Sequence, residues 1–153
     1  MKAQFFYKNP NAPKPNKPNH IGVAAIIKNG NKVLLEKRAD CGRWALIGGG
    51  PKADETLKEC LKREIFEETG LELFDFKFID ILDDPSRIAQ YPDGNILRTV
   101  TVLYSAELAA IPELVVSSES TELKFFSVDG LHNLDIVETH KHIVDDYVLN
   151  FSV

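Results

Sequence analysis

The chain has 153 residues, of which 44% are hydrophobic and 27% charged, as is typical of one globular domain with a substantial core. Its net charge of −5 argues against a nucleic-acid-binding protein, because such proteins need lysine and arginine to neutralise phosphates. No apolar run approaches the ~20 residues of a membrane span, and the N-terminus lacks the apolar region of a signal peptide. We therefore expect a cytoplasmic protein that binds neither nucleic acid nor membranes, with Cys41 and Cys60 reduced.

Residues 1–19 are predicted to form an extended arm before a folded domain at residues 20–153. The segment KNPNAPKPNKPN at 8–19 contains four prolines among lysines and asparagines, and this composition favours an extended chain. The preceding AQFFY can form a short strand. The arm is either a simple tether or a contact to a partner subunit, so a homodimer is a possible assembly.

The first half of the folded part shows strand signals followed by a helix. Two apolar runs joined around Asn29-Gly30 predict a β-hairpin. Residues 54–69 are predicted to form a helix, with Asp54 in the N-cap position and Gly70 just beyond its end.

The second half contains mainly strand signals. Residues 73–82 alternate, with three phenylalanines on one predicted face, and YPDG at 91–94 is a turn. We expect a long strand at 95–108, a short one at 123–128 and an amphipathic helix at 133–150. Strands interleaved with two helices indicate a single-domain α/β or α+β sandwich.

Three glutamates, Glu64, Glu67 and Glu68, crowd the end of the predicted helix. On a helical wheel, Glu64 and Glu68 share the inward stripe with Leu57 and Leu61. Half-buried carboxylates require a compensating positive charge, either from basic side chains or from a hard divalent cation such as Mg²⁺. The glycines of GRWALIGGG, just before the helix, allow the backbone to approach a ligand closely. The pattern favours a metal site that faces a cleft.

This segment resembles the Nudix box, G-x5-E-x7-R-E-U-x-E-E-x-G-U, in which U is a bulky aliphatic residue. Every defined position is matched, by Gly49, Glu55, Arg63-Glu64-Ile65, Glu67-Glu68 and Gly70-Leu71. The resemblance to the MutT-like Nudix hydrolases implies an α/β/α sandwich around a mixed β-sheet. It also implies an enzyme that uses Mg²⁺ or Mn²⁺ to cleave the pyrophosphate of a nucleoside diphosphate linked to another moiety X.

The resemblance assigns roles to individual residues. Glu64, Glu67 and Glu68 would ligate the metal, with Glu119 as a further ligand and with help from a backbone carbonyl at Gly49 or Gly50. Arg63 would orient the glutamates, and Glu55 would support the start of the helix. The general base stays open between Glu64 or Glu68 in the box and Glu119 or Glu122 after it. Glu119 is equally compatible with a solvated loop position.

The substrate is less well indicated. Pro85 lies about fifteen residues beyond the box, where similar ADP-ribose-cleaving proteins carry a proline, so ADP-ribose or another nucleotide sugar is favoured. The alternatives are a non-catalytic nucleotide-sugar sensor and a house-cleaning nucleoside triphosphate pyrophosphatase. Trp44 could stack on a base, although a core position is more common. Arg43, Arg87 and Arg98 could contact phosphates, although solvent-exposed positions are more common.

Overall fold

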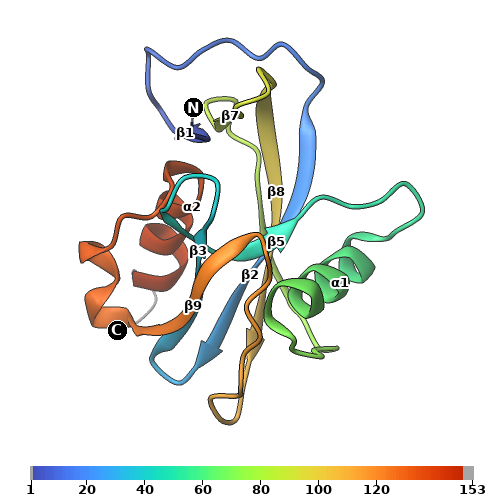
Figure 1. Cartoon of the computed structure of the whole chain (residues 1–153), viewed down its shortest axis with the longest axis vertical. Helices are drawn as coiled ribbons and strands as arrows, with labels where there is room; N and C mark the ends of the chain where they lie inside the picture. The colour runs from blue at the N-terminus through green and yellow to red at the C-terminus, as the bar shows by residue number, and fades with distance from the viewer. Residues whose placement is uncertain (1, 150–153) are drawn as a thin grey trace.

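The computed structural model describes residues 2–149 as a mixed β-sheet with helices on both faces (Figure 1). The strands of this part of the chain are β1 (Gln4–Phe6), β2 (His20–Asn29), β3 (Lys32–Arg38), β4 (Trp44–Ala45), β5 (Ile47–Gly49), β6 (Lys77–Leu82), β7 (Ile88–Gln90), β8 (Ile96–Glu107) and β9 (Ser120–Ser127). The helices are α1 (Leu57–Thr69), the 3₁₀ helix η1 (Val128–Asn133), α2 (Glu138–Val144) and the π-helix η2 (Asp145–Leu149).

The sheet runs in the order β1-β7-β8-β2-β3-β4, while β5 pairs with β2, β6 with β8 and β9 with β3. The central strands β2 and β8 are parallel, with Val23 opposite Val102, and the other strand pairs are antiparallel. The predicted mixed sheet and the hairpin around Asn29-Gly30 are therefore confirmed.

Successive residues of β2 point to opposite faces of the sheet, and each face has its own core. Val23, Ala25 and Ile27 belong to the apolar cluster that contains the inner residues of α1. Ala24 and Ile26 belong to the cluster that contains the buried residues of α2. In Figure 1, α1 and α2 accordingly lie on opposite sides of the sheet, which confirms the three-layer prediction.

The start of α1 differs from the prediction. The N-cap is Thr56, whose Oγ1 accepts a hydrogen bond from the Glu59 amide at 3.1 Å, while the Glu59 carboxylate accepts one from the Thr56 amide at 3.0 Å. The prediction of Asp54 was wrong, because a threonine followed three residues later by glutamate closes this reciprocal capping box. Gly70 ends the helix as predicted, at φ 78°, a left-handed conformation that favours glycine.

Replacing Thr56 with alanine is expected to lower the free energy of unfolding by about 1 kcal/mol, because the Glu59 amide then loses its capping partner. Asp54→Ala should leave the free energy of unfolding almost unchanged. Urea denaturation of both variants at neutral pH measures this difference, and equal losses would contradict the assignment of the cap.

Three further elements depart from the sequence-based prediction. The strand expected at 73–82 begins at Lys77, and Phe74 before it is 66% exposed. The short strand β7 was not predicted. The C-terminal helix expected at 133–150 begins at Glu138 and passes into the π-helix η2, while position 150 lies outside the described residues.

The N-terminal arm lies on the chain's own sheet. Strand β1 pairs antiparallel with β7, with Phe5 opposite Ala89, which confirms the strand expected at AQFFY. Beyond it, the Asn16 side chain donates a hydrogen bond to Gly94 O and accepts one from the Ile96 amide. The arm is therefore anchored to the β7–β8 hairpin. The domain boundary at residues 19 and 20 and the homodimer stay predictions.

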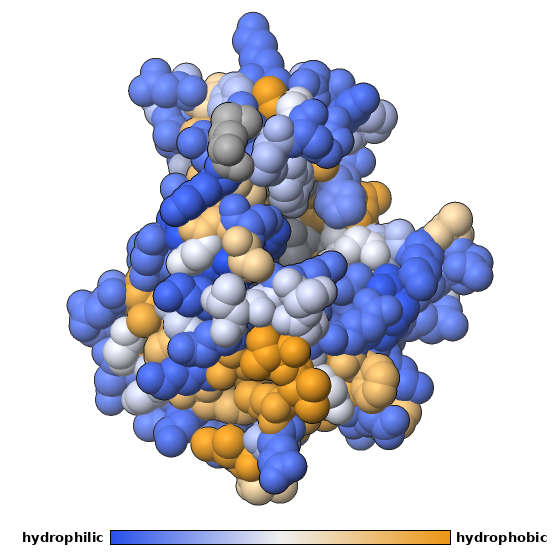
Figure 2. All heavy atoms as spheres, in the orientation of Figure 1, coloured by the Kyte–Doolittle hydropathy of each residue, from blue (hydrophilic) through white to orange (hydrophobic). Residues whose placement is uncertain are grey.

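The connection between β8 and β9 carries exposed apolar side chains at Ile111, Val115 and Val116. Figure 2 shows a mainly hydrophilic face with an apolar patch in its lower centre, over the region where Figure 1 draws this connection between β9 and α1. The Val115 amide donates a hydrogen bond to Thr69 O at 2.9 Å, so the connection is fixed to the end of α1. Within residues 2–149, none of the helices has the length and apolar composition needed to cross a membrane.

Candidate active site

A cavity of about 460 Å³ lies between α1, β3, β5 and the end of the β8–β9 connection. Four glutamates from three separate segments line it, and these are Glu36 in β3, Glu64 and Glu68 in α1, and Glu119 just before β9. The remaining lining residues are His20, Arg38, Ala39, Asp40, Gly48, Gly49, Gly50 and Tyr91. The fold thus brings together acidic groups that lie far apart in the sequence.

The inward stripe of α1 is apolar at its start and acidic at its end, as the helical wheel predicts. Leu61 is fully buried and Glu68 is 4% exposed, while the Glu64 side chain is 14% exposed. The Glu67 side chain, which the wheel places to one side, is 53% exposed. Glu64 and Glu68 therefore line the cavity, whereas Glu67, also predicted as a metal ligand, is not among its lining residues.

The carboxylate of Glu68 is the least compensated group of the cavity. Its Oε2 is buried and has no hydrogen-bond partner among residues 2–149. Burial raises the pKa of Glu68 far above its usual range, and the nearby charges of Glu36, Glu64 and Glu119 raise it further. In the absence of a cation, burial and these charges therefore favour the neutral form of this side chain.

Sequence reasoning missed Glu36, which is 6% exposed. Ser120 Oγ donates a hydrogen bond to its Oε2 at 2.8 Å, but burial nevertheless raises the pKa of Glu36 above its usual range. The segment KVLLEKR contained a signal for a buried acid. Residues alternate along a strand, so Glu36 points to the same face of the sheet as Leu34, which packs in the apolar cluster that contains the inner residues of α1.

Arg63 forms ion pairs with Glu55, which precedes α1, and with Glu64 and Glu67 in the helix. Its Nε and Nη2 donate to both carboxylate oxygens of Glu55, at 2.6 and 2.8 Å. Its Nη1 donates to Glu64 at 2.9 Å and to Glu67 at 3.1 Å. The guanidinium holds the pKa of Glu55 at about 2. These are the ion pairs expected of a residue that orients glutamates, and its role in activity stays a prediction.

The glycines before α1 are required by close contacts. A Cβ at Gly49 would lie 2.4 Å from Glu64 Cδ, so only glycine allows that carboxylate to lie against the backbone. A Cβ at Gly50 would lie 2.7 Å from Cε1 of His20. The carbonyl oxygen of Gly50 accepts a hydrogen bond from Arg63 at 3.2 Å. Ligation of a metal by a carbonyl at Gly49 or Gly50 stays a prediction.

The donor chemistry of the cavity fits a hard divalent cation. Its charged oxygen donors are carboxylates, which Mg²⁺ and Mn²⁺ prefer as ligands. Glu68 Oε2 has no hydrogen-bond partner among residues 2–149, so it is available to bind a cation. No group of three His, Cys, Asp or Glu side chains within residues 2–149 is already arranged as a complete ligand set. Arg63 holds Glu64 and Glu67, so a cation would have to compete with it for these two carboxylates.

Several residues considered from the sequence lie outside the cavity. Trp44 packs edge-to-face on Phe126, with ring centroids 4.8 Å apart, and Arg43 forms ion pairs with Asp135 and Glu138. The others are Arg98, which donates to Asp83 O, Glu122, which is exposed on β9, and Pro85, which is exposed in the β6–β7 turn. None of the five lines the cavity.

Arg87 is fully buried, so the expectation of an exposed arginine was wrong. Its guanidinium lies beside a narrow cavity of about 100 Å³ that adjoins the acidic one and shares His20, Glu36 and Arg38 with it. Its hydrogen-bond acceptors are all uncharged, and these are Leu82 O, Thr99 O, Thr101 Oγ1, Thr139 O and His142 Nε2. Arg87 thus connects the sheet to α2, while burial lowers its own pKa to about 10.

Two histidines of α2 are kept neutral. Nδ1 of His140 accepts a hydrogen bond from the Leu46 amide at 3.0 Å, and His142 accepts one from Arg87 at 2.9 Å. Burial, with the charge of Arg87 adding to it, lowers the pKa of His140 to about 3 and that of His142 to about 4.

Acid should therefore weaken the fold through His140 and His142. The pKa of each is lower in the folded than in the unfolded chain, so their contribution to stability is complete above pH 6.5 and falls as the pH drops towards 4. Their NMR resonances are expected not to titrate between about pH 7.5 and 5.5. Titration of His142 with a midpoint near pH 6.5 would contradict this assignment.

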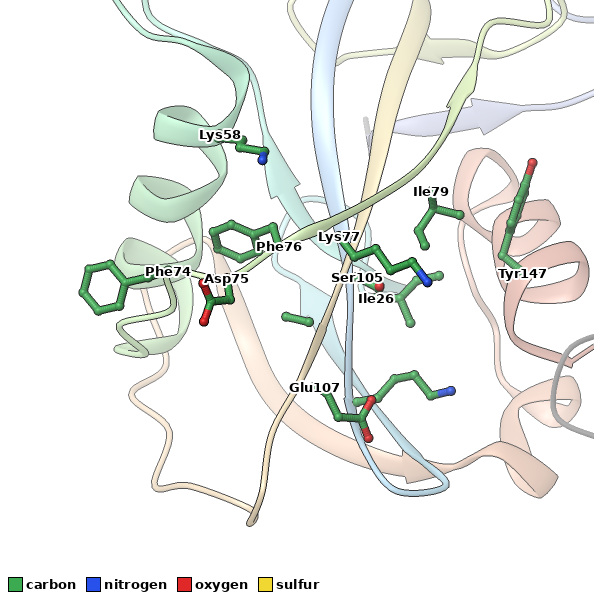
Figure 3. A pocket seen from close by; sticks show the side chains of 12 residues that line it. Ile26, Lys58, Phe74, Asp75, Phe76, Lys77, Ile79, Ser105, Glu107 and Tyr147 are labelled. Atoms are coloured by element: carbon green, nitrogen blue, oxygen red, sulfur yellow. The ribbon is translucent and has the colours of Figure 1, made fainter.

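A larger hollow, of about 920 Å³, lies elsewhere on the molecule (Figure 3). Phe74 and Phe76 lie on one side of it and Tyr147 on the other, with Lys77 and Glu107 from the sheet between them. It contains none of the four glutamates and no group of acids that converge on one point. Although this hollow is larger, it is therefore not our candidate active site.

Residues 18–147 match the protein family described as NUDIX domain. An ADP-ribose pyrophosphatase of Methanocaldococcus jannaschii is 32% identical over 131 residues, which are 84% of this chain and 72% of that protein. The nucleoside triphosphatase NudI of an Enterobacter species is 33% identical over 124 residues, which are 76% of this chain and 87% of that protein.

A solved structure shares the fold. It is a bifunctional NMN adenylyltransferase/ADP ribose pyrophosphatase from Francisella tularensis complexed with AMP and a manganese ion, with a TM-score of 0.70 and 24% identity. The similarity covers 86% of this chain and 42% of that chain, so this chain spans less than half of the bifunctional protein.

Proposed function

This chain belongs to the Nudix family, and we propose that it is a metal-dependent pyrophosphohydrolase acting on a nucleoside diphosphate linked to another moiety X. The products would be a nucleoside monophosphate and phosphorylated X. The observation that carries the proposal is the buried, unpartnered carboxylate of Glu68 in a cavity that three further glutamates line.

Glu64, Glu67, Glu68 and Glu119 would hold Mg²⁺ or Mn²⁺ in this cavity. The bound metal would neutralise pyrophosphate oxygens and lower the pKa of an attacking water. Among the candidate bases, Glu122 is not among the residues that line the cavity, whereas Glu119 is exposed and lines it. We place proton uptake at Glu119, because its carboxylate can pass the proton to solvent, and Glu68 is enclosed.

Arg63→Lys is expected to reduce metal-dependent activity by about 10–100-fold, the usual effect of losing a group that orients metal ligands. Lysine keeps the charge but cannot contact Glu55, Glu64 and Glu67 at the same time. The measurement is the Mg²⁺ concentration that gives half-maximal rate, together with the maximal rate. An unchanged metal dependence would show that the Arg63 ion pairs serve stability alone.

ADP-ribose or a related nucleotide sugar is our first candidate substrate, and the support is the relative from Methanocaldococcus jannaschii named as an ADP-ribose pyrophosphatase. A nucleoside triphosphate is the second candidate, because another relative of similar identity is named as a nucleoside triphosphatase. Pro85 gives no structural support to either, since it lies in an exposed turn outside the cavity.

The decisive experiment is a hydrolysis panel with Mg²⁺, Mn²⁺ or chelator. It includes ADP-ribose, sugar nucleotides, dinucleoside polyphosphates and the nucleoside triphosphates, normal and oxidised. Metal-dependent release of a nucleoside monophosphate supports the proposal, and the released partner tells the substrate classes apart. Absence of hydrolysis together with binding of ADP-ribose would favour a sensor. A cytoplasmic location is part of the proposal, and the two buried, unbridged cysteines support it.

A further inference from the structure

We propose that Glu36, which lies outside the glutamate-bearing helix, is a further carboxylate of the cation site and sets its affinity together with Glu68. This inference rests on the proposed metal-dependent function. It concerns the opposite wall of the same cavity, where β3 faces the end of α1.

The backbone holds Glu36 in a fixed position. Strand β3 is paired on both sides at this residue, with Ala45 of β4 and with Leu123 of β9. The side chain is 6% exposed, and Ser120 Oγ donates to its Oε2 at 2.8 Å. Most single hydrogen bonds contribute about 1 kcal/mol, less than the usual cost of burying a carboxylate. The Ser120 contact alone therefore does not explain an acid at this position.

The basic side chains around Glu36 are engaged elsewhere. Arg38 donates to both carboxylate oxygens of Asp40, at 2.8 and 2.6 Å. Arg63 is held by the acids of the box and by Gly50 O. Within residues 2–149, neither Glu36 nor Glu68 forms an ion pair with a lysine, arginine or histidine.

Two enclosed carboxylates therefore share one cavity, and among the described residues neither is ion-paired with a cationic side chain. Besides burial, the charge of Glu36 raises the pKa of Glu68, as expected for two carboxylates that line the same cavity. Glu68 Oε2 is unpartnered and buried, so the cavity contains an acceptor that the described residues leave unsatisfied. A hard divalent cation would satisfy this acceptor and compensate both charges, because such ions bind carboxylate oxygens directly or through retained water.

The test is a titration of the full chain with Mn²⁺, followed by electron paramagnetic resonance of the free ion and by calorimetry. Glu36→Gln is expected to weaken Mn²⁺ binding by about 10–100-fold, because glutamine keeps the size and the Ser120 contact but removes the charge. Glu122→Gln is the matched control, since this exposed acid on β9 carries the same charge and lies outside the cavity. Its Mn²⁺ affinity should equal that of wild type.

A second variant separates position from charge. Ser120→Ala leaves Glu36 in place but removes the hydrogen bond that orients it, so Mn²⁺ binding should weaken less than in Glu36→Gln. Thermal denaturation in chelator checks folding, and Glu36→Gln should melt no lower than wild type, because burial disfavours the charged form of Glu36 and glutamine carries no charge. Equal Mn²⁺ affinity of Glu36→Gln and wild type would overturn the inference. Absence of Mn²⁺ binding by wild type would instead overturn the proposed metal site as a whole.

Discussion

Glu68→Gln is expected to lower the rate of pyrophosphate hydrolysis by about 10²–10⁴-fold, because a bound metal stabilises transition-state charge by several kcal/mol and each 1.36 kcal/mol corresponds to a tenfold change in rate. The change removes the negative charge that would bind the metal, but glutamine has almost the same shape. In the metal-free protein, burial favours the neutral form of the Glu68 carboxyl, which glutamine resembles. The fold should therefore persist.

Two measurements separate the roles of Glu68. Steady-state rates at saturating Mg²⁺ are compared with those of Glu113→Gln, an exposed acid in the β8–β9 connection that serves as the matched control. Stability in chelator is measured against pH. The pKa of Glu68 is raised in the folded state, so its contribution to stability is complete below about pH 4.5 and is lost as the pH rises.

Glu68→Gln should accordingly have a higher free energy of unfolding than wild type at about pH 8, and this difference should shrink on acidification. A variant with wild-type turnover would remove Glu68 from the metal site.

Arg87→Met is expected to lower the free energy of unfolding by roughly 3–5 kcal/mol, which makes it the largest stability effect that we predict. Methionine fills most of the volume but donates no hydrogen bonds. It would leave the carbonyls of Leu82, Thr99 and Thr139 without this donor inside the core. Buried acceptors without partners are more costly than the loss of the bonds themselves.

Thermal and urea denaturation would measure this effect, with a fall in Tm of about 2–4 °C for each kcal/mol. Arg87→Lys is the graded control, because it keeps the charge and part of the donor capacity and should fall between wild type and Arg87→Met. Catalytic rates of folded Arg87→Met at low temperature should stay close to wild type. A loss of less than about 1 kcal/mol would show that water can replace the guanidinium.

Local sequence signals predicted the features that depend on neighbouring residues. The hairpin at Asn29-Gly30, the end of α1 at Gly70 and the inward direction of Glu64 and Glu68 all follow from turn chemistry and helical periodicity. The error at Asp54 is also local, because two possible caps lie two residues apart and the reciprocal bond to Glu59 decides between them.

Tertiary contacts fixed what the sequence alone did not reveal. Glu36 lies in an apolar segment whose pattern predicts only a buried strand. It becomes a candidate site residue because the end of α1, with Glu64 and Glu68, lines the same cavity. From the sequence, Arg87 is expected at the surface, as most arginines are. In the structure its guanidinium donates hydrogen bonds to five uncharged acceptors in the interior. The π-helix η2 has no sequence signal that we identified.

The parallel pairing of β2 with β8 has a consequence for the order of folding during synthesis. His20 pairs with Thr99, so the two central strands leave the ribosome several seconds apart at ordinary translation rates. Until β8 arrives, β2 and β3 expose the apolar faces that later form both cores, and chaperones bind such surfaces. The acid cavity is completed later still, when Glu119 and Ser120 close over β3. A nascent chain can therefore complete the acid cavity only after the segments that form both central strands, β2 and β8, have been synthesised.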